Sequence, residues 1–465
     1  MKRTPATNRA SLQNATPVLL TTAAAWIALS GWMIARNPTL GFAIGIAPIV
    51  AFVLVRFAAA RVIAVVGGGM VVLGSSSDLG PNKIIFAAVV VVCAAVSGYR
   101  LIQNPPRYAW VFRPVLWWGL AVIAAIAVSY LASPAGSEIG TFGRQSIFYL
   151  LIVFGPIIGL DSARDLKPGT VYGAIGVIGV IAAAGFAADW LDRRGVTALP
   201  VGRFVLSSLV LPGFAFGLAL VLFFHSRGLL RRTLWLIPIV GIPIAMLVTG
   251  TRTNLIIFIA IVAVLGRYAN IRVPAGRMLL LVAAAGAAGL AIFPAIASVA
   301  VSDPAFIQQR VQAALSAVTG GGDQSLAIRQ AQATVANEMV NENPFLGYGL
   351  GYAIPFTVDS PLLTVLRLGW VGTALVVGFI GALSVAFFRA RRAYGPTPAS
   401  TAWWAFIAIC FANIIFGTPL EDRGFGFTVM LACMAIGAGL QASTAQPAEE
   451  NRKSSGRSRA RVRTL

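Results

Sequence analysis

The chain has 465 residues, of which 58% are hydrophobic and only 11% are charged, and its formal net charge is +21. Soluble domains are about 45–50% apolar and about 25% charged. A chain this apolar could not cover its surface with polar groups, so a soluble cytosolic enzyme is excluded. Apolar runs of about 20 residues recur along the sequence, which predicts an all-α bundle of membrane-spanning helices.

The apolar runs divide the chain into membrane and non-membrane regions. We predict twelve to fourteen spans, with helices 1–11 within 16–297 and helices 12–14 within 363–441. The expected spans are 16–34, 39–57, 62–76, 84–102, 115–132, 145–160, 169–188, 204–224, 233–249, 253–266, 278–297, 363–388, 402–417 and 425–441. Residues 1–15 form a short polar N-terminus, and 442–465 form a basic tail that we expect to be disordered.

Charge fixes the expected orientation. With the N-terminus in the cytoplasm, the inner loops and termini hold 25 of the 36 basic residues but only 4 of the 15 acidic residues. This excess of Lys and Arg on one side is the positive-inside pattern. Both termini are therefore predicted to be cytoplasmic.

One long loop, 298–362, falls on the outer side. Loops of this length usually carry a function. Helical patterns run from Asp303 to about Val318 and from about Asp323 to Asn341, where Pro344 ends the second helix. We expect a small helical cap over the outer ends of the spans.

Arginines at the outer membrane edge are the candidate ligands for an anion. Arg252 lies in the tight turn Thr249–Asn254, and Arg329 lies on a largely small and apolar face of the second cap helix. Arg144 and Arg203 also fall at outer span ends. Converging guanidinium groups suit a diphosphate, which they bind in fork geometry. Anchoring in the lipid headgroup layer is the alternative for each of them.

The return from the cap to the bundle supplies further candidates. Asp359 precedes the span at 363, where it is either a helix N-cap or a functional carboxylate at the membrane edge. Arg367 follows on the same helix and could pair with Asp359 or with an anionic substrate. Gly347 and Gly349 belong to a glycine-rich stretch that either cradles a phosphate or docks the cap onto the bundle.

The order of these segments resembles the O-antigen ligase/polymerase superfamily of bacterial envelope glycosyltransferases. The resemblance rests on Thr249-Gly250-Thr251-Arg252, an arginine-headed helix from Arg329, the run Glu342–Gly351, and Asp359-Ser360 followed by Gly369-Trp370-Val371-Gly372. It covers about 249–372. The ligase branch has a histidine where this chain has Asp359, which favours a polymerase or an unassigned member of the superfamily over a ligase.

The resemblance implies transfer of a glycan from a polyprenyl diphosphate carrier to the hydroxyl of a glycan or lipid-glycan acceptor on the outer face. In that reaction Arg252 and Arg329 would hold the diphosphate, and Asp359 would take the acceptor proton with inversion at the anomeric carbon. No metal, no other cofactor and no nucleic acid would take part.

Three alternatives remain open at this stage. The main one is a transporter or flippase of envelope precursors, a class that shows broken helices and midplane charges. A second is a peptidoglycan polymerase of the shape-and-division family, and a third is a non-catalytic assembly protein of the envelope.

Overall fold

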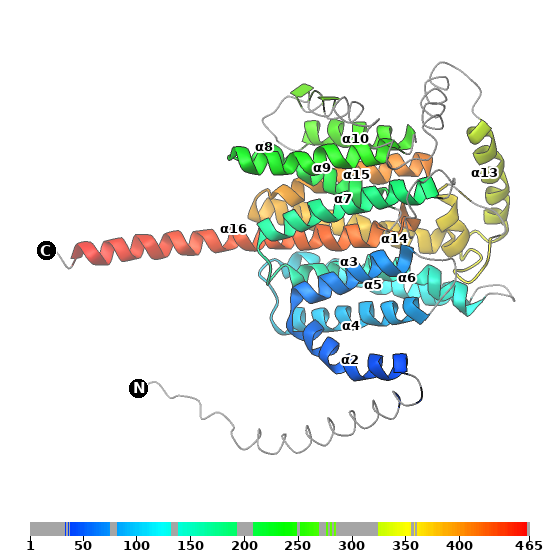
Figure 1. The fold of residues 1–465 in the computed structure, drawn as a ribbon, viewed down its shortest axis with the longest axis horizontal. Coiled ribbons are helices and arrows are strands. Elements are labelled where there is room, and N and C mark those ends of the chain that lie inside the picture. Colours follow the sequence, from blue (N-terminus) through cyan, green and yellow to red (C-terminus); the bar gives the residue numbers. More distant parts are fainter. Residues whose placement is uncertain are drawn as a thin grey trace. The chain divides into compact units, whose positions relative to one another are not determined.

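The computed structural model describes residues 33, 36, 38–74, 81–131, 138–192, 208–248, 252–268, 276–277, 280, 283–284, 324–354, 358 and 360–462. The elements in this part of the chain are helical (Figure 1). They are α2 (Pro38–Arg56), α3 (Ala58–Gly74), α4 (Pro81–Gln103), α5 (Ala109–Leu131), α6 (Ile139–Ser162), α7 (Pro168–Asp192), α8 (Val210–His225), α9 (Leu229–Val248), α10 (Arg252–Tyr268), α13 (Gln324–Glu342), α14 (Leu362–Tyr394), α15 (Pro398–Phe416), the 3₁₀ turn η1 (Pro419–Glu421) and α16 (Phe425–Val462).

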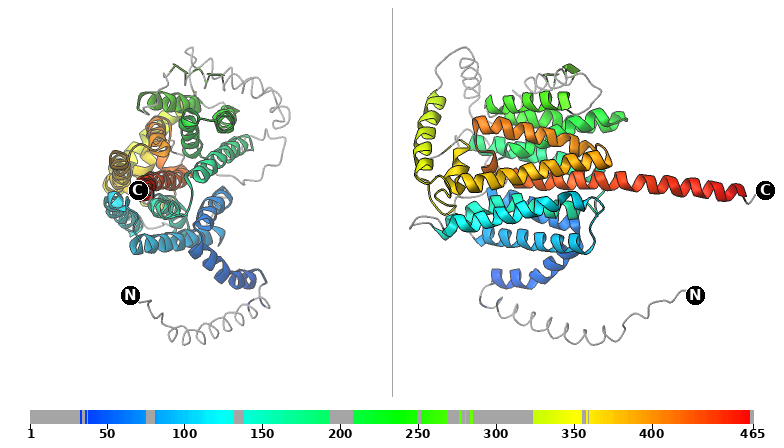
Figure 2. Two further views of the ribbon diagram at one scale, coloured as in Figure 1. Left: turned by 90° about the vertical axis from the view of Figure 1, so that its left-hand side faces the viewer. Right: turned by 180° about the vertical axis from the view of Figure 1, so that it is seen from behind.

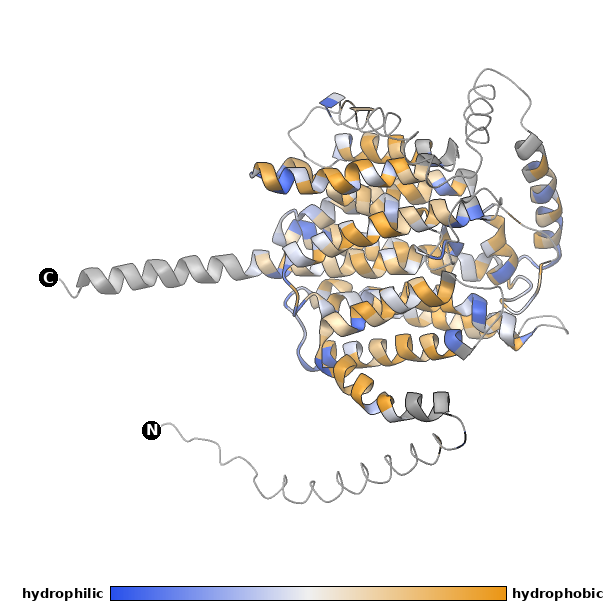
Figure 3. Cartoon of the chain, viewed as in Figure 1, coloured by the Kyte–Doolittle hydropathy of each residue, from blue (hydrophilic) through white to orange (hydrophobic). Residues whose placement is uncertain are grey.

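The helices confirm a multi-pass membrane bundle. Within the described ranges, seven helices are long and apolar enough to cross a membrane, or eight if the broken pair α2 and α3 makes one span. Shorter apolar helices lie in α8, α10 and α15. Each predicted span from 39–57 to 253–266, and each from 363–388 onward, coincides with one helix. The predicted spans 16–34 and 278–297 lie mostly outside the described residues. Hydrophobic residues predominate along the helices of the bundle (Figure 3).

The chain divides into two units, Met1–Arg61 and Val62–Leu465. In the first unit, the end of α2 is closed by Arg61, whose fully buried guanidinium donates to the carbonyl of Leu54 at 2.7 Å. A cation at a helix C-terminus satisfies carbonyls that have no partner within the helix.

In the second unit, α16 forms the centre of the bundle (Figure 2, left). It packs most extensively against α6, and also contacts α7, α8, α14 and α15. The sequence Gly155-Pro-Ile-Ile-Gly159 on α6 makes the contact possible: a Cβ at Gly159 would lie 2.3 Å from the carbonyl oxygen of Met430. Small residues four apart let two helix backbones approach closely within a membrane.

Predictions were also made for the C-terminal tail and for the helical cap. The tail was expected to be disordered from 442, but α16 continues as a helix to Val462. The reason is that a span already supplies the helical nucleus, and the tail is rich in Ala and Arg, which extend a helix readily. The second cap helix is confirmed as α13, which lies across one end of the bundle (Figure 1). The first, near 303–318, lies outside the described residues.

Candidate functional site

The loop between α15 and α16 carries three consecutive charged residues, Glu421, Asp422 and Arg423, which we call the charged hub. Glu421 accepts hydrogen bonds from the hydroxyl of Tyr149 on α6 and from the guanidinium of Arg367 on α14. The Glu421 side chain is 7% exposed and that of Arg367 is 16% exposed, so the pair is largely shielded from water. One carboxylate thus joins α6 and α14.

Asp422 holds the start of α8. Its carboxylate accepts from the hydroxyl of Ser208 at 2.6 Å, from the amide of Leu209 at 2.7 Å and from the amide of Gly424 at 2.8 Å. Burial raises the pKa of this carboxyl above its ordinary value, and the hydrogen bonds from Ser208, Leu209 and Gly424 oppose that shift. A carboxylate at a helix N-terminus satisfies amides that the helix itself leaves without partners.

Arg423 completes the charged hub. Its guanidinium donates to the carbonyl of Leu73, in the last turn of α3, at 3.0 Å. Three neighbouring residues therefore contact four helices, α3, α6, α8 and α14, at one end of the bundle.

The glycine-rich run after α13 docks onto a break in α14. Gly369 interrupts that helix with φ 64° and ψ −179°. The freed amide of Trp370 donates to the carbonyl of Pro344 at 2.8 Å, and the freed carbonyl of Leu366 accepts from the amide of Tyr348 at 2.7 Å. The segment thus supplies the hydrogen bonds that the broken helix lacks.

Glycine is required at the contact. A Cβ at Gly369 would lie 2.0 Å from the carbonyl oxygen of Phe345, and a Cβ at Gly347 would lie 2.6 Å from the backbone nitrogen of Gly369. Both residues also have positive φ. Next to this contact in the chain, Val365 and Leu366 of α14 pack with Ala336 and Val340 of α13 in one apolar cluster.

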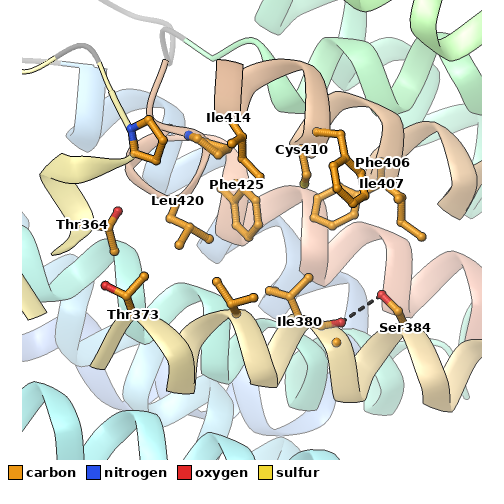
Figure 4. A pocket seen from close by; sticks show the side chains of 15 residues that line it. Thr364, Thr373, Ile380, Ser384, Phe406, Ile407, Cys410, Ile414, Leu420 and Phe425 are labelled. Atoms are coloured by element: carbon orange, nitrogen blue, oxygen red, sulfur yellow. Dashed lines mark hydrogen bonds between the residues drawn. The ribbon is translucent and has the colours of Figure 1, made fainter. Parts of the chain in front are cut away.

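An apolar groove of about 410 Å³ lies between α14 and α15 (Figure 4). Its walls include Val377 and Ile380 on α14, and Phe406 and Ile414 on α15. The hydroxyl groups in the lining come from Thr364 and Thr373 at one end and Ser384 at the other (Figure 4).

The end of the groove at Thr364 adjoins the charged hub. Pro419 and Leu420, which precede Glu421 in the chain, line it, and Thr364 is one helical turn from Arg367. The hydroxyl of Thr373 is buried and makes no hydrogen bond to any described residue. An apolar channel that ends beside a cation and hydroxyl groups suits an amphiphile with an apolar chain and a polar head.

The structure describes the four arginines predicted for the site to different extents. Arg252 is the first residue of α10 and Arg329 lies in the second turn of α13, and for both the structure describes the backbone position alone. α10 packs mainly against α15 and α8, whereas α13 packs against α14. Arg144 is a partly exposed residue near the start of α6, and Arg203 lies outside the described residues.

Asp359 also lies outside the described residues, although its neighbours Val358 and Ser360 are described. Val358 belongs to the apolar cluster between α13 and α14, and the Ser360 hydroxyl accepts from the amide of Leu362 at the start of α14. For Arg367 we expected Asp359 or a substrate as partner, but the structure pairs it with Glu421.

The glycines Gly347 and Gly349 are both buried in the docking segment. The amide of Gly347 donates to the carbonyl of Asn343 at 3.0 Å, and the carbonyl of Gly349 accepts from Tyr352. Of the two roles that the sequence left open, the described geometry is that of a docking turn, and phosphate binding by these glycines stays a prediction.

The charged hub was not predicted from the sequence, because its loop is short. A signal was present: Glu421-Asp422-Arg423 is a run of three charged residues between two apolar spans, in a chain that is 11% charged. Charges so close to a membrane edge are costly unless they have partners. Such a run therefore predicts a buried polar cluster.

Across the described residues no group of three or more His, Cys, Asp or Glu side chains is arranged to hold a metal ion. Comparison with models of known protein families finds no match, and no curated protein matches the chain either. The assignment of a function therefore rests on the sequence motifs and on the geometry of this end of the bundle.

Proposed function

We propose that the chain is a membrane glycosyltransferase of the O-antigen ligase/polymerase type, which moves a glycan from a polyprenyl diphosphate carrier to an acceptor hydroxyl. The observation that carries this proposal is the apolar groove between α14 and α15, which ends beside the charged hub and the docked cap. The groove suits the isoprenoid chain, and the hydroxyl groups of Thr364 and Thr373 at one end of it suit a polar head. Its volume, about 410 Å³, is typical of small-molecule sites.

The same proposal places this end of the bundle outside the cell. Arg389, Arg391 and Arg392 lie at the end of α14 that is remote from the charged hub, and the basic tail also leaves the bundle there. An excess of Arg and Lys marks the cytoplasmic side of bacterial membrane proteins. The cap, the groove mouth and the charged hub would then face outward, in the bacterial cytoplasmic membrane.

In the proposed reaction the acceptor hydroxyl attacks the anomeric carbon. The bond from that carbon to the diphosphate oxygen breaks, and the diphosphate leaves with the bonding electrons. Arg252 and Arg329 stabilise the negative charge that develops on it. Asp359 takes the proton of the acceptor hydroxyl, and attack opposite the leaving group inverts the anomeric configuration.

Reconstituted protein tests these roles. With a polyprenyl diphosphate-linked glycan as donor, Arg252→Ala and Arg329→Ala should each lower turnover by about 10²–10³. Asp359→Asn should abolish turnover and leave donor binding intact. Arg310→Ala, within the first predicted cap helix and outside the set of proposed ligands, is the matched control. Full turnover of a folded Asp359→Asn protein would refute the base role.

Deletion of the gene tests the substrate class. The proposal expects polyprenyl-linked glycans to accumulate, which mass spectrometry of lipid extracts would detect. An unchanged profile of lipid-linked and surface glycans would contradict the proposal and favour an assembly protein.

One observation keeps a transporter of envelope precursors as the second candidate. α14 is broken at Gly369, and discontinuous helices are typical of transporters. A flux assay separates the two: movement of the lipid-linked glycan between the leaflets of a vesicle, without glycosidic bond formation, would favour transport.

A further inference from the structure

A second, polar pocket lies at the opposite end of the bundle. It has a volume of about 480 Å³ and lies between the turn that joins α4 to α5, the end of α6, and α16 where it leaves the bundle. Asn104, Arg107 and Tyr108 line it from the turn, Arg164 lines it from the end of α6, and Gln441 and Thr444 line it from α16. The reaction proposed above does not use this pocket.

The walls of this pocket are fixed by hydrogen bonds. The amide of Gln441 donates to the carbonyl of Arg164 at 3.2 Å. The hydroxyl of Tyr394 donates to the carbonyl of Arg107 at 3.0 Å and accepts from the indole of Trp110 at 3.1 Å. The backbone carrying Arg107 is therefore held in place before any ligand binds.

The charge around the pocket is positive. Arg100 pairs with Asp165 at 2.8 Å and with Asp161 at 3.5 Å, and Arg164 lies 3.7 Å from Asp161. Arg107 is exposed and pairs with no carboxylate in the part of the chain that the structure describes. Three arginines thus face two aspartates, which leaves one excess positive charge at Arg107.

The hydroxyl of Tyr108 is a buried polar group in the wall of this pocket. The residue is 1% exposed, and its hydroxyl hydrogen-bonds to none of the described residues. It lies beside Gly437, one helical turn from Gln441 on α16. Buried hydroxyl groups without a partner are rare, and a bound group that reaches the Tyr108 hydroxyl would supply the missing acceptor.

We propose that this pocket binds the phosphate of an anionic phospholipid in the adjacent leaflet. A lipid phosphate is an acceptor, and Arg107, Arg164 and the Tyr108 hydroxyl are donors. The pocket lies where the spans end, which is the depth of lipid headgroups. Basic pockets between spans on the cytoplasmic side are known to select acidic lipid headgroups.

Native mass spectrometry of the full-length chain tests the proposal. The protein, purified in detergent, is titrated with phosphatidylglycerol and, in parallel, with phosphatidylcholine. One phosphatidylglycerol should bind at least tenfold more tightly than phosphatidylcholine. Arg107→Gln should weaken that binding about tenfold, which is the effect of losing one charge-assisted contact. Tyr108→Phe should also weaken it, by a smaller factor.

Arg113→Gln is the matched control, because Arg113 is an exposed arginine at the same end of α5 that does not line the pocket. Equal losses from Arg107→Gln and Arg113→Gln would overturn the proposal, because they would indicate general surface attraction. Equal binding of the two lipids would also overturn it. Displacement of the lipid by millimolar inorganic phosphate would assign the pocket to a soluble phosphate and overturn the lipid source.

Discussion

Arg367 and Glu421 form an ion pair between α14 and the loop that precedes α16, although 54 residues separate them in the sequence. The other oxygen of the Glu421 carboxylate accepts from Tyr149. The Nε of Arg367 is buried and has no partner among the described residues. The guanidinium thus depends on one carboxylate for its position and its charge compensation.

Glu421→Ala should therefore destabilise the protein more than an ordinary charge deletion. Breaking a buried pair by removing one partner costs about 3–5 kcal/mol, and we expect the lower end because Arg367 is 16% exposed. Thermal unfolding in detergent measures this as a lower apparent melting temperature. Glu338→Ala, on the exposed face of α13, should change stability by less than about 0.5 kcal/mol. Equal melting temperatures for the two variants would show that the pair contributes nothing.

Gly369→Ala should detach the cap from the bundle. An alanine there would place Cβ 2.0 Å from the Phe345 carbonyl oxygen and would force positive φ on a residue that disfavours it. We expect faster proteolysis of the segment that joins α13 to α14, and a loss of about 2–4 kcal/mol in stability.

Gly173→Ala on α7 is the control for this substitution, because a Cβ at Gly173 meets no atom within 4 Å. In a helix it should be neutral or stabilising by up to about 1 kcal/mol. If both alanine variants resist protease like the parent protein, the docking contact does not hold the cap.

Alkaline pH should loosen the same cap. The hydroxyl of Tyr348 donates to Glu342, and burial together with this bond raises the pKa of Tyr348 above its ordinary value of 10.0. The folded protein then holds this proton more tightly than the unfolded chain does. The stability from the bond is complete below pH 10 and is lost as the pH rises above 10 through the folded-state pKa.

Tyr348→Phe isolates this effect. The variant should be less stable than the parent protein at pH 8, and the difference should shrink between pH 10 and pH 12. Melting temperatures in detergent across that range provide the measurement. A difference that stays constant over the range would mean that Tyr348 does not titrate as described.

The sequence was sufficient to place the helices because a membrane span is a local feature. Twenty apolar residues in a row predict a helix whatever surrounds them, which is why α4 and α14 were found from hydropathy. The end of α13 is also a local feature, because Pro344 follows its last residue by two positions. The helical course of the tail was missed because its composition was read without the span that nucleates it.

The charged hub could not be derived in the same way, because its partners are distant in the sequence. Glu421 meets Tyr149 across 272 positions, and Asp422 meets Ser208 across 214. A single sequence without an alignment gives no information on such pairs. The break at Gly369 was likewise read as part of a motif, because positive φ is a property of the folded backbone and cannot be seen in a glycine on its own.

The groove gives the most direct test of the proposed substrate. Gly381 lines it, and a Cβ at that position meets no atom within 4 Å, so a larger side chain would project into the groove without displacing its neighbours. Gly381→Leu should therefore leave the melting temperature unchanged and weaken binding of the polyprenyl carrier by about tenfold, measured as a raised KM or Kd. Gly173→Leu makes the same substitution on α7, away from the groove, and should leave carrier binding intact. Because the groove is proposed for the isoprenoid chain, a water-soluble donor with a shortened chain should bind the parent protein and Gly381→Leu alike. Normal affinity of Gly381→Leu for the full-length carrier would show that the chain binds elsewhere, and it would remove the observation on which the proposed function rests.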